Sequence, residues 1–118
     1  MKISIITSVP SLVNSFAENT MLRKAIVEKI IDFHIIDLRE FADNNYKQID
    51  DIPYGGGDGM VLMAKPLMKA IDYSLDLLSS EIEDTRIVYP SPQGKKWDQK
   101  VAQECVSVKN FIFICGRY

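Results

Sequence analysis

Apolar residues in this chain fall into short runs that alternate with helical stripes. The run Ile3–Ile6 and the segments Ile30–Leu38 and Arg86–Tyr89 have the length and the aliphatic content of strands. Asn110–Cys115 is apolar from its second residue onward, which is typical of a central strand covered on both faces. The pattern therefore predicts strands in all of these segments, with the last of them in the middle of a sheet.

Between these runs, apolar residues recur with the spacing of one helix face. Helices are predicted just after Pro10 and from Pro66, because proline is tolerated in a first helical turn. A helix from Thr20 would use that threonine as its N-cap, and a helix over Trp97–Val108 has Asp98 near its start. The apolar stripes consist of Leu12, Val13 and Phe16; of Leu22, Ile26 and Ile30; of Leu67, Ile71, Leu75 and Leu78; and of Val101, Cys105 and Val108. Strands that alternate with helices predict an α/β fold with a mainly parallel sheet and flanking helices.

The segment Pro53–Met60 interrupts this alternation, since half of its residues are glycine. Glycine at this density is tolerated where the backbone turns through positive φ or lies close to a ligand. A mobile linker is the alternative, although the apolar exit Met60–Met63 does not have linker composition. The whole polar stretch Arg39–Gly59 is predicted to be one long loop, with 44–60 poorly ordered in the absence of ligands.

Composition narrows the class of protein. The 118 residues suffice for one domain, with 47% apolar and 25% charged residues. The net charge of −2 provides no overall basic field, so RNA would need a local patch or a further segment to bind. No signal peptide or membrane span is predicted, and Cys105 and Cys115 are expected to be buried free thiols, so we expect a cytoplasmic protein.

Two strand ends carry unusual sequences, Tyr89–Gly94 with its prolines and Cys115–Tyr118 with its glycine. A proline-rich turn alone is usually only a turn. If the two strands are neighbours, however, both segments converge on one crevice at the carboxyl edge of the sheet, where α/β proteins bind ligands. Because the chain ends where a binding loop is expected to begin, we expect it to be part of a longer protein.

The sequence gives little support to several common kinds of catalytic or metal site. The glycine run fits neither a P-loop nor a G-x-G-x-x-G site, which argues against an ATPase and a standard dinucleotide enzyme. His34 is expected to be structural, no set of residues resembles a zinc site, and Ser91 has no G-x-S-x-G setting. Asp50 and Asp51 fit either a solvated turn or a pair that orients a base in a cleft.

Three separated segments, Ile49–Met60, Ser91–Gly94 and Cys115–Tyr118, together resemble the signature blocks of the bacterial tRNA (guanine-N1)-methyltransferases, the TrmD family. The resemblance implies a SPOUT-type trefoil-knot fold and a homodimer. It also implies transfer of a methyl group from S-adenosylmethionine to N1 of the guanosine 3′ of the anticodon (position 37) in tRNA, with magnesium as a possible requirement.

The same resemblance implies that 1–118 is the amino-terminal S-adenosylmethionine-binding methyltransferase domain, truncated, with its knot incomplete. The catalytic aspartate and arginine and the carboxyl-terminal tRNA-binding domain would lie beyond Tyr118. No catalytic residue and no metal ligand is therefore assigned within the chain, and alone it is expected to be inactive and to bind cofactor weakly or not at all. The residues assigned to the cofactor are Tyr89, Pro90, Ser91, Pro92, Gly116 and Tyr118, and those assigned to the target guanine are Asp50, Tyr54, Gly55, Gly56, Gly57 and Gly59.

The chain departs from the family pattern at a few positions. Asp58 stands where a small residue or proline is commoner, Tyr46–Lys47 replaces a His-Arg pair, and Pro90 replaces an aliphatic residue. Lysine lacks the bidentate fork of arginine, so the second change weakens a predicted phosphate or base contact. These departures and the net negative charge leave a second hypothesis open, in which the protein is a non-catalytic RNA- or nucleotide-binding module on the same scaffold. An unrelated α/β nucleotide-binding enzyme is a third hypothesis.

Overall fold

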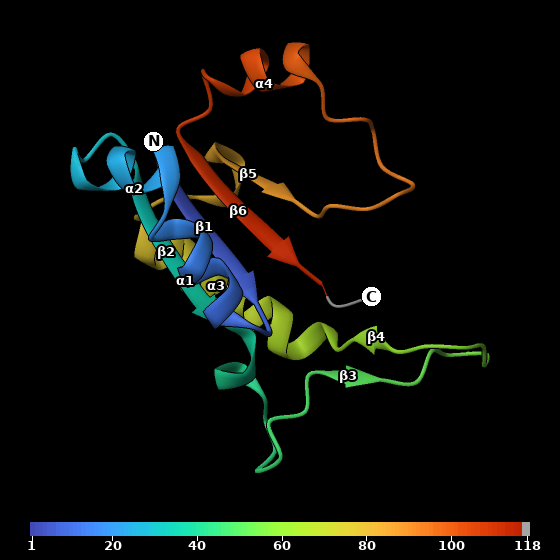
Figure 1. Ribbon diagram of the computed structural model, residues 1–118. Coiled ribbons are helices and arrows are strands. Elements are labelled where there is room, and N and C mark those ends of the chain that lie inside the picture. Colours follow the sequence, from blue (N-terminus) through green and yellow to red (C-terminus); the bar gives the residue numbers. More distant parts are fainter. Residues whose placement is uncertain (117–118) are drawn as a thin grey trace.

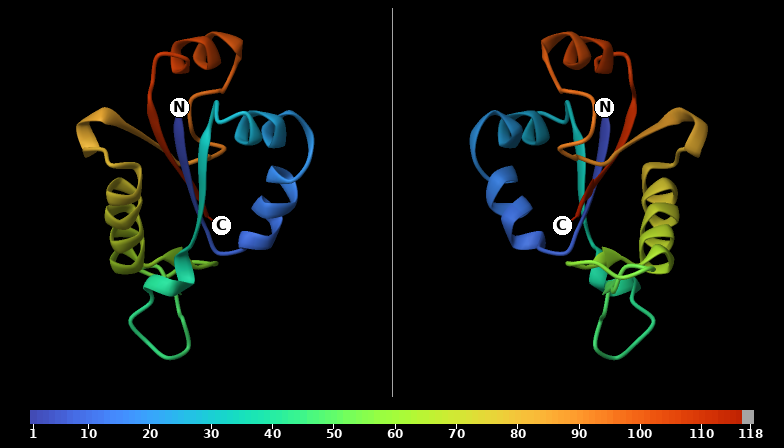
Figure 2. Two further views of the ribbon diagram at one scale, coloured as in Figure 1. Left: turned by 90° about the vertical axis from the view of Figure 1, so that its left-hand side faces the viewer. Right: turned by 90° about the vertical axis from the view of Figure 1, so that its right-hand side faces the viewer.

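The computed structural model describes residues 1–116 and shows a four-stranded parallel sheet with helices on both faces (Figures 1 and 2). The strands are β1 (Lys2–Thr7), β2 (Asp32–Asp37), β5 (Thr85–Val88) and β6 (Asn110–Cys115), and their order across the sheet is β2-β1-β6-β5. Every neighbouring pair is parallel. The predicted α/β class and parallel sheet are confirmed, with β6 in a central position.

The helices divide between the two faces of the sheet. Helix α3 (Ala64–Leu78) covers one face, while α1 (Pro10–Ala17) and α2 (Thr20–Val27) lie on the other (Figure 2). Helix α4 (Gln99–Cys105) connects β5 to β6, and Asp98 caps it by accepting a hydrogen bond from the Val101 amide at 3.0 Å. Two 3₁₀ helices complete the description, η1 (Leu38–Phe41) and η2 (Ile82–Asp84).

Two predictions about α2 were wrong. The helix begins with Thr20 itself, and Asn19 occupies the cap position with extended backbone. Ile30 was assigned to the apolar stripe, but α2 ends at Val27 and the Ile30 side chain is 60% exposed. The chain bends into β2 at this point, with the Ile30 amide bonded to the Ala25 carbonyl, so the helical spacing that includes Ile30 is coincidental.

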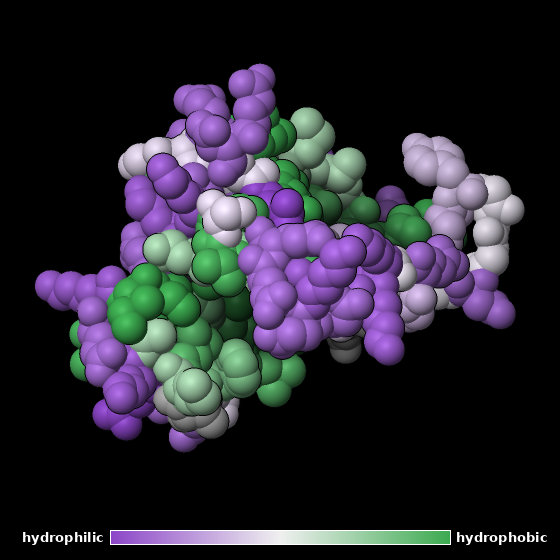
Figure 3. Space-filling view, turned by 90° about the horizontal axis from the view of Figure 1, so that it is seen from above, coloured by the Kyte–Doolittle hydropathy of each residue, from purple (hydrophilic) through white to green (hydrophobic). Residues whose placement is uncertain are grey.

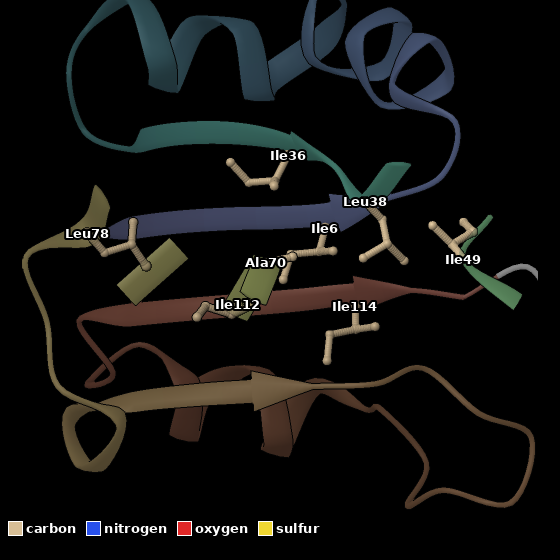
Figure 4. Close-up of a cluster of buried hydrophobic side chains, with 8 residues drawn as sticks. All are labelled: Ile6, Ile36, Leu38, Ile49, Ala70, Leu78, Ile112 and Ile114. Carbon is tan, nitrogen blue, oxygen red and sulfur yellow. The ribbon is translucent and has the colours of Figure 1, made fainter. Parts of the chain in front are cut away.

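The core lies between α3 and the sheet. Alternate strand residues face the helix, since successive side chains of a strand point to opposite faces. Figure 4 shows the buried cluster of Ile6, Ile36, Leu38, Ile49, Ala70, Leu78, Ile112 and Ile114. Ile49 belongs to it although it lies in the long polar stretch, and the Met63 amide bonds to its carbonyl at 2.8 Å. The segment between η1 and α3 is thus anchored to the core in its middle.

The stretch predicted as one loop, Arg39–Gly59, contains regular secondary structure. It begins with η1, and its residues Asp50–Asp51 form strand β3, which pairs antiparallel with β4 (Val61–Leu62). Strands of two residues have no periodicity of their own, so the hydrophobic pattern could not reveal them. The expected disorder of residues 44–60 without ligands stays a prediction.

Ser4 of β1 and Ser74 of α3 form a polar pair inside the core, and both are 0% exposed. The Ser4 hydroxyl donates to Ser74 Oγ at 3.0 Å, and Ser74 donates to the Ala70 carbonyl at 2.8 Å. A buried hydroxyl left without its partner costs about 1–3 kcal/mol, whereas removal of both partners can be nearly neutral.

We therefore expect Ser74→Ala to lower the free energy of unfolding of this chain by about 1–3 kcal/mol in urea titrations, because it orphans the Ser4 hydroxyl. The double variant Ser4→Ala with Ser74→Ala is expected to recover part of that loss. A double variant less stable than Ser74→Ala alone would contradict the assigned pairing.

Candidate functional site

The carboxyl ends of β5 and β6 lie side by side. Their register pairs Val88 with Phe113, so the segments that follow both strands leave the sheet at the same edge. Tyr89 comes directly after β5 and Gly116 directly after β6. The prediction that the proline-containing turn and the terminal glycine segment converge is confirmed by this register.

Tyr89 and Gly116 are in close contact. A Cβ atom built on Gly116 would lie 3.0 Å from both Cε2 and Oη of Tyr89, closer than side chains normally approach. The phenol ring therefore covers the glycine backbone, and a side chain at position 116 would have to displace it. The contact favours glycine, because any other residue at position 116 requires the ring to shift by a few tenths of an ångström.

The turn after Tyr89 is fixed by its own hydrogen bonds. The Gln93 amide donates to Ser91 Oγ at 3.2 Å, and the Gly94 amide donates to the Ser91 carbonyl at 3.0 Å. Pro90 and Pro92 restrict the backbone dihedral angles. Because proline has no N–H, neither residue can donate a hydrogen bond to a neighbouring strand, and β5 ends before them. The result is an exposed but restrained loop at the carboxyl edge.

Two cavities meet at Tyr89, one on each face of the sheet. The first, about 620 Å³, lies on the α3 side and is lined by Met60, Val61, Leu62, Leu67, Tyr89 and Ile114. The second, about 750 Å³, is lined by Phe113, by residues 86–88 of β5 and by most of the segment 89–97. Phe113 and Ile114 line different cavities because they point to opposite faces of β6. Tyr89 lines both.

The first cavity includes residues that the sequence did not identify as functional. Met60, Val61 and Leu62 leave the glycine run, and Leu67 is in the first turns of α3. Their apolar character was visible in the sequence, but Met60, Val61 and Leu62 served only as an argument against a linker, and Leu67 only as part of a helix stripe. All of these side chains are apolar, so this cavity is suited to the flat or aliphatic part of a ligand.

The hairpin β3–β4 brings Asp50 opposite Leu62, one of the residues that line the first cavity. Asp50 is half-buried, and its carbonyl accepts a hydrogen bond from Gln48 Nε2 at 2.9 Å. The structure thus places this predicted substrate residue beside the same compartment as Tyr89.

The glycine tip of the hairpin lies apart from both cavities. Tyr54 is fully exposed, and the pale tip projects well clear of the molecule in Figure 3. Gly59 has φ of 96° and no atom within 4 Å of the place a Cβ would take, so the backbone conformation there favours glycine while the space around it is open. Gly55, Gly56 and Gly57 lie in the same projecting tip, and Tyr118 lies outside the described residues.

A charged cluster fixes the start of the polar stretch to α3. The Asp43 carboxylate accepts from Lys65 Nζ at 2.6 Å and also from Lys69. Hydrogen bonds from Lys65 and then Lys69 hold the pKa of Asp43 below its usual value of 3.8. The sequence did not reveal this contact, because it joins residues more than twenty positions apart; it is called the Asp43 clamp below.

The remaining candidate groups are the histidine and the two cysteines. His34 Nε2 lies 2.9 Å from the Asp32 carboxylate. Both cysteines are free; Cys105 is buried as expected, while Cys115 is half-buried and has a raised thiol pKa because of burial. Among residues 1–116, no group of three or more His, Cys, Asp or Glu could hold a metal ion. None of the helices in that range is long and apolar enough to cross a bilayer.

Known proteins match the chain from end to end. A family model described as tRNA (Guanine-1)-methyltransferase TrmD covers residues 1–118. The curated tRNA (guanine-N(1)-)-methyltransferase of Borrelia turicatae is 41% identical over 118 residues, which are 100% of this chain and 47% of that protein. The corresponding protein of Buchnera aphidicola is 44% identical over 114 residues, 97% of this chain and 42% of its own length.

A solved structure matches as well. The crystal structure of tRNA (m1G37) methyltransferase from Aquifex aeolicus has a TM-score of 0.85 and 32% sequence identity, and the match covers 99% of this chain and 51% of that one. The chain thus spans about half the length of the curated relatives it matches. With matches to the family model and to curated members along its whole length, it belongs to the TrmD family of tRNA (guanine-1)-methyltransferases.

Proposed function

We propose that this chain is the amino-terminal half of an S-adenosylmethionine-dependent tRNA methyltransferase that modifies N1 of guanosine 37, immediately 3′ of the anticodon. The observation that carries the proposal is the contact of Tyr89 with Gly116 at the adjacent ends of β5 and β6. Gly116 belongs to one family motif, Tyr89 precedes the turn that carries another, and Met60 of the third motif lines the apolar cavity at Tyr89.

The residues around Tyr89 fit a nucleoside cofactor. An apolar cavity, an aromatic ring and a restrained turn with main-chain carbonyls are the usual means of holding a flat heterocycle. S-adenosylmethionine, when bound, supplies an electrophilic methyl group on its sulfonium. The residues proposed to hold it are Tyr89, Pro90, Ser91, Pro92 and Gly116, together with Tyr118.

Asp50 is proposed to orient the target guanine. Its carboxylate can accept hydrogen bonds from the N–H groups on the edge of the base, and β3 fixes its backbone against β4. Gly59 and the neighbouring glycines Gly55, Gly56 and Gly57, with Tyr54, would give the base a backbone surface to approach closely. Methyl transfer requires the donor carbon and the accepting nitrogen in line, so positioning contributes a large part of the rate.

The proposal extends to features that depend on the longer protein. It acts in the cytoplasm as a homodimer, and chain beyond Tyr118 completes a trefoil knot and supplies the catalytic aspartate. A requirement for magnesium is part of the proposal from family resemblance alone, since residues 1–116 offer no cluster of ligands for the ion.

The test uses the longer protein with a tRNA transcript that carries guanosine at position 37 and a matched transcript with adenosine there. We expect mass spectrometry to find N1-methylguanosine in the first transcript only, with none formed by residues 1–118 alone. Folded protein that binds the cofactor but methylates neither transcript would favour the non-catalytic module. Folded protein that does not bind the cofactor would overturn the proposal.

A further inference from the structure

Strand β2 is an outer strand of the sheet, and no strand among residues 1–116 pairs with its free edge. On the β1 side, the Asp32 amide donates to the Met1 carbonyl at 3.0 Å. Because the main-chain groups of successive strand residues point to alternate sides, the N–H and C=O groups of Phe33 and Ile35 point away from β1. A free edge of this kind is a template to which another extended segment can add as a strand.

Two cavities follow this edge and continue one another. The smaller, about 240 Å³, is lined by Asn14 of α1, by Tyr73 of α3 and by the carboxyl end of β2. The larger, about 520 Å³, includes the same two residues in its lining and extends along β2 to Phe33. Helices α1 and α3 lie on opposite faces of the sheet (Figure 2), so both cavities lie beside the strand, at its outer edge. Together they are called the β2 groove below.

The lining of the β2 groove suits a single strand. Strand β2 has six residues, and six residues of extended chain span about 20 Å. Tyr73 and Leu77 would contact the side chains of an added strand that point to the α3 face, and Ala17 and Ile26 those that point to the other face. Main-chain hydrogen bonds to β2 would provide affinity, and these contacts would select apolar side chains at alternate positions.

The charge along the β2 groove is negative. Asp37 and Glu40 line the groove at the carboxyl end of β2, and Asp32 is exposed at the start of the strand. Among the described residues, no lysine or arginine lines either cavity. Since complementary charge steers a partner to its site and fixes its register, the occupant is expected to carry positive charge.

Two cations close to the groove in the sequence are already engaged. Lys69 is one helical turn before Tyr73 on α3, but it belongs to the Asp43 clamp. Arg39 lies between Asp37 and Glu40 in the chain, but its Nε donates to the Ser8 carbonyl at 3.4 Å, beyond the end of β1. Neither side chain is therefore assigned to the carboxylates of the groove.

A second copy of the same edge is a poor occupant. In a symmetric antiparallel pair of two β2 strands, the Asp32 carboxylate of each copy would lie opposite the Asp37 carboxylate of the other. Like charges that are directly opposite one another destabilise a pair of strands. The edge therefore suits a segment whose composition differs from its own.

We propose that the β2 groove docks an extended segment of a partner protein, in which apolar residues alternate with lysine or arginine and which adds to β2 as a strand. The groove is separate from the cavities at Tyr89, because β2 and β5 are the two outer strands of the sheet. The inference is thus independent of the proposed methyl transfer. Occupation of the groove by the longer protein's own chain is the alternative outcome of the test.

The experiment titrates the longer protein with a fluorescent nonapeptide of alternating valine and lysine, and anisotropy reports binding. One control peptide has glutamate in place of lysine. The other keeps every side chain but has methyl groups on two consecutive central amide nitrogens, one of which would face β2 in either register. We expect the unmodified lysine peptide to bind at least about tenfold more tightly than either control, since each control removes a class of contact.

Hydrogen exchange measured by NMR locates the bound peptide. The lysine peptide is expected to slow exchange of the outward-pointing amides of Phe33 and Ile35 by about tenfold or more, because a hydrogen-bonded amide exchanges only when its bond opens. The amides of β5 are the matched control, since β5 is the other outer strand of the sheet. Their exchange is expected to stay unchanged.

A charge variant tests the carboxylates. Asp37→Asn with Glu40→Gln is expected to weaken binding of the lysine peptide by about two- to tenfold, the effect of losing two exposed ion pairs. Asparagine can still accept the hydrogen bond that Asp37 accepts from the Arg39 amide, so the fold should persist. Glu81→Gln with Glu83→Gln removes two exposed carboxylates just before β5 and is expected to change the affinity by less than about twofold.

Each contrary result overturns the inference. Equal affinities for the lysine and glutamate peptides would overturn the assigned charge, and full affinity of the methylated peptide would overturn strand addition. Protection of β5 in place of Phe33 and Ile35 would overturn the location. If the amides of Phe33 and Ile35 exchange slowly in the longer protein before peptide is added, its own chain covers the groove and the partner segment is excluded.

Discussion

Gly116→Ala is expected to lower the affinity of the longer protein for S-adenosylmethionine by about a hundredfold while the protein remains folded. The added methyl group would lie 3.0 Å from Cε2 and Oη of Tyr89, so the ring must shift from its place by a few tenths of an ångström. The ring is half exposed and can move into solvent, which keeps the cost in stability small. Overpacking by an added methyl group costs about 1–3 kcal/mol, and in a binding wall this corresponds to a loss of affinity of up to about a hundredfold.

Calorimetric titration with cofactor, together with thermal unfolding, measures this effect, and a double-mutant cycle identifies its cause. If the methyl group acts by displacing the ring, Gly116→Ala should cause little further loss of affinity in a Tyr89→Ala background. Contacting residues show such non-additivity, whereas independent ones do not. Fully additive losses would therefore contradict the assigned contact.

Gly59→Val is expected to reduce kcat/KM for tRNA by about a hundredfold, which is the loss of rate that a misplaced reactant can cause. The affinity for the cofactor is expected to stay nearly unchanged. Gly59 has φ of 96°, and no atom approaches the position of its missing side chain. A β-branched residue is strained in this backbone region and would fill the open space proposed for the guanine. Gly59 itself does not line the cavity at Tyr89, although the next residue, Met60, does, so the cofactor should be affected much less than tRNA turnover.

A second substitution at position 59 can show whether the loss comes from backbone strain or from a side chain that blocks the guanine. Asparagine tolerates left-handed backbone better than valine does but has a side chain of similar size. Gly59→Asn should thus remain impaired if the side chain blocks the base, and should recover if strain is the cause. Steady-state methylation against tRNA concentration and cofactor titration provide the two readouts. Equal losses of tRNA turnover and cofactor affinity in Gly59→Val would contradict the separate roles.

The parallel sheet could be predicted because its signals are local. Asn110–Cys115 combines apolar content with length, and the α3 stripe Leu67–Leu78 has helical spacing over about three turns. The convergence of Tyr89 and Gly116 followed from one further assumption, that their strands are neighbours. By contrast, the stripe predicted on α1 is not buried within the described structure, since Leu12 and Phe16 are 70% and 62% exposed. Spacing shows that a face is apolar but not what covers it.

The features that sequence reasoning missed all depend on contacts between distant positions. Ser4 with Ser74 and Asp43 with Lys65 are pairs of ordinary residues that acquire a role only when the chain has folded. The β3–β4 hairpin is held by Ile49, a single apolar residue in a polar stretch, which gives no period to detect. Such contacts are decided by tertiary packing, which overrides local propensity.

Tyr89 is a partition between two compartments, one on either side of the sheet. Because Tyr89 lines both compartments, a molecule in one of them that displaces its ring also alters the shape of the other. By thermodynamic linkage, the effect is mutual: each occupant changes the affinity of the other by the same factor.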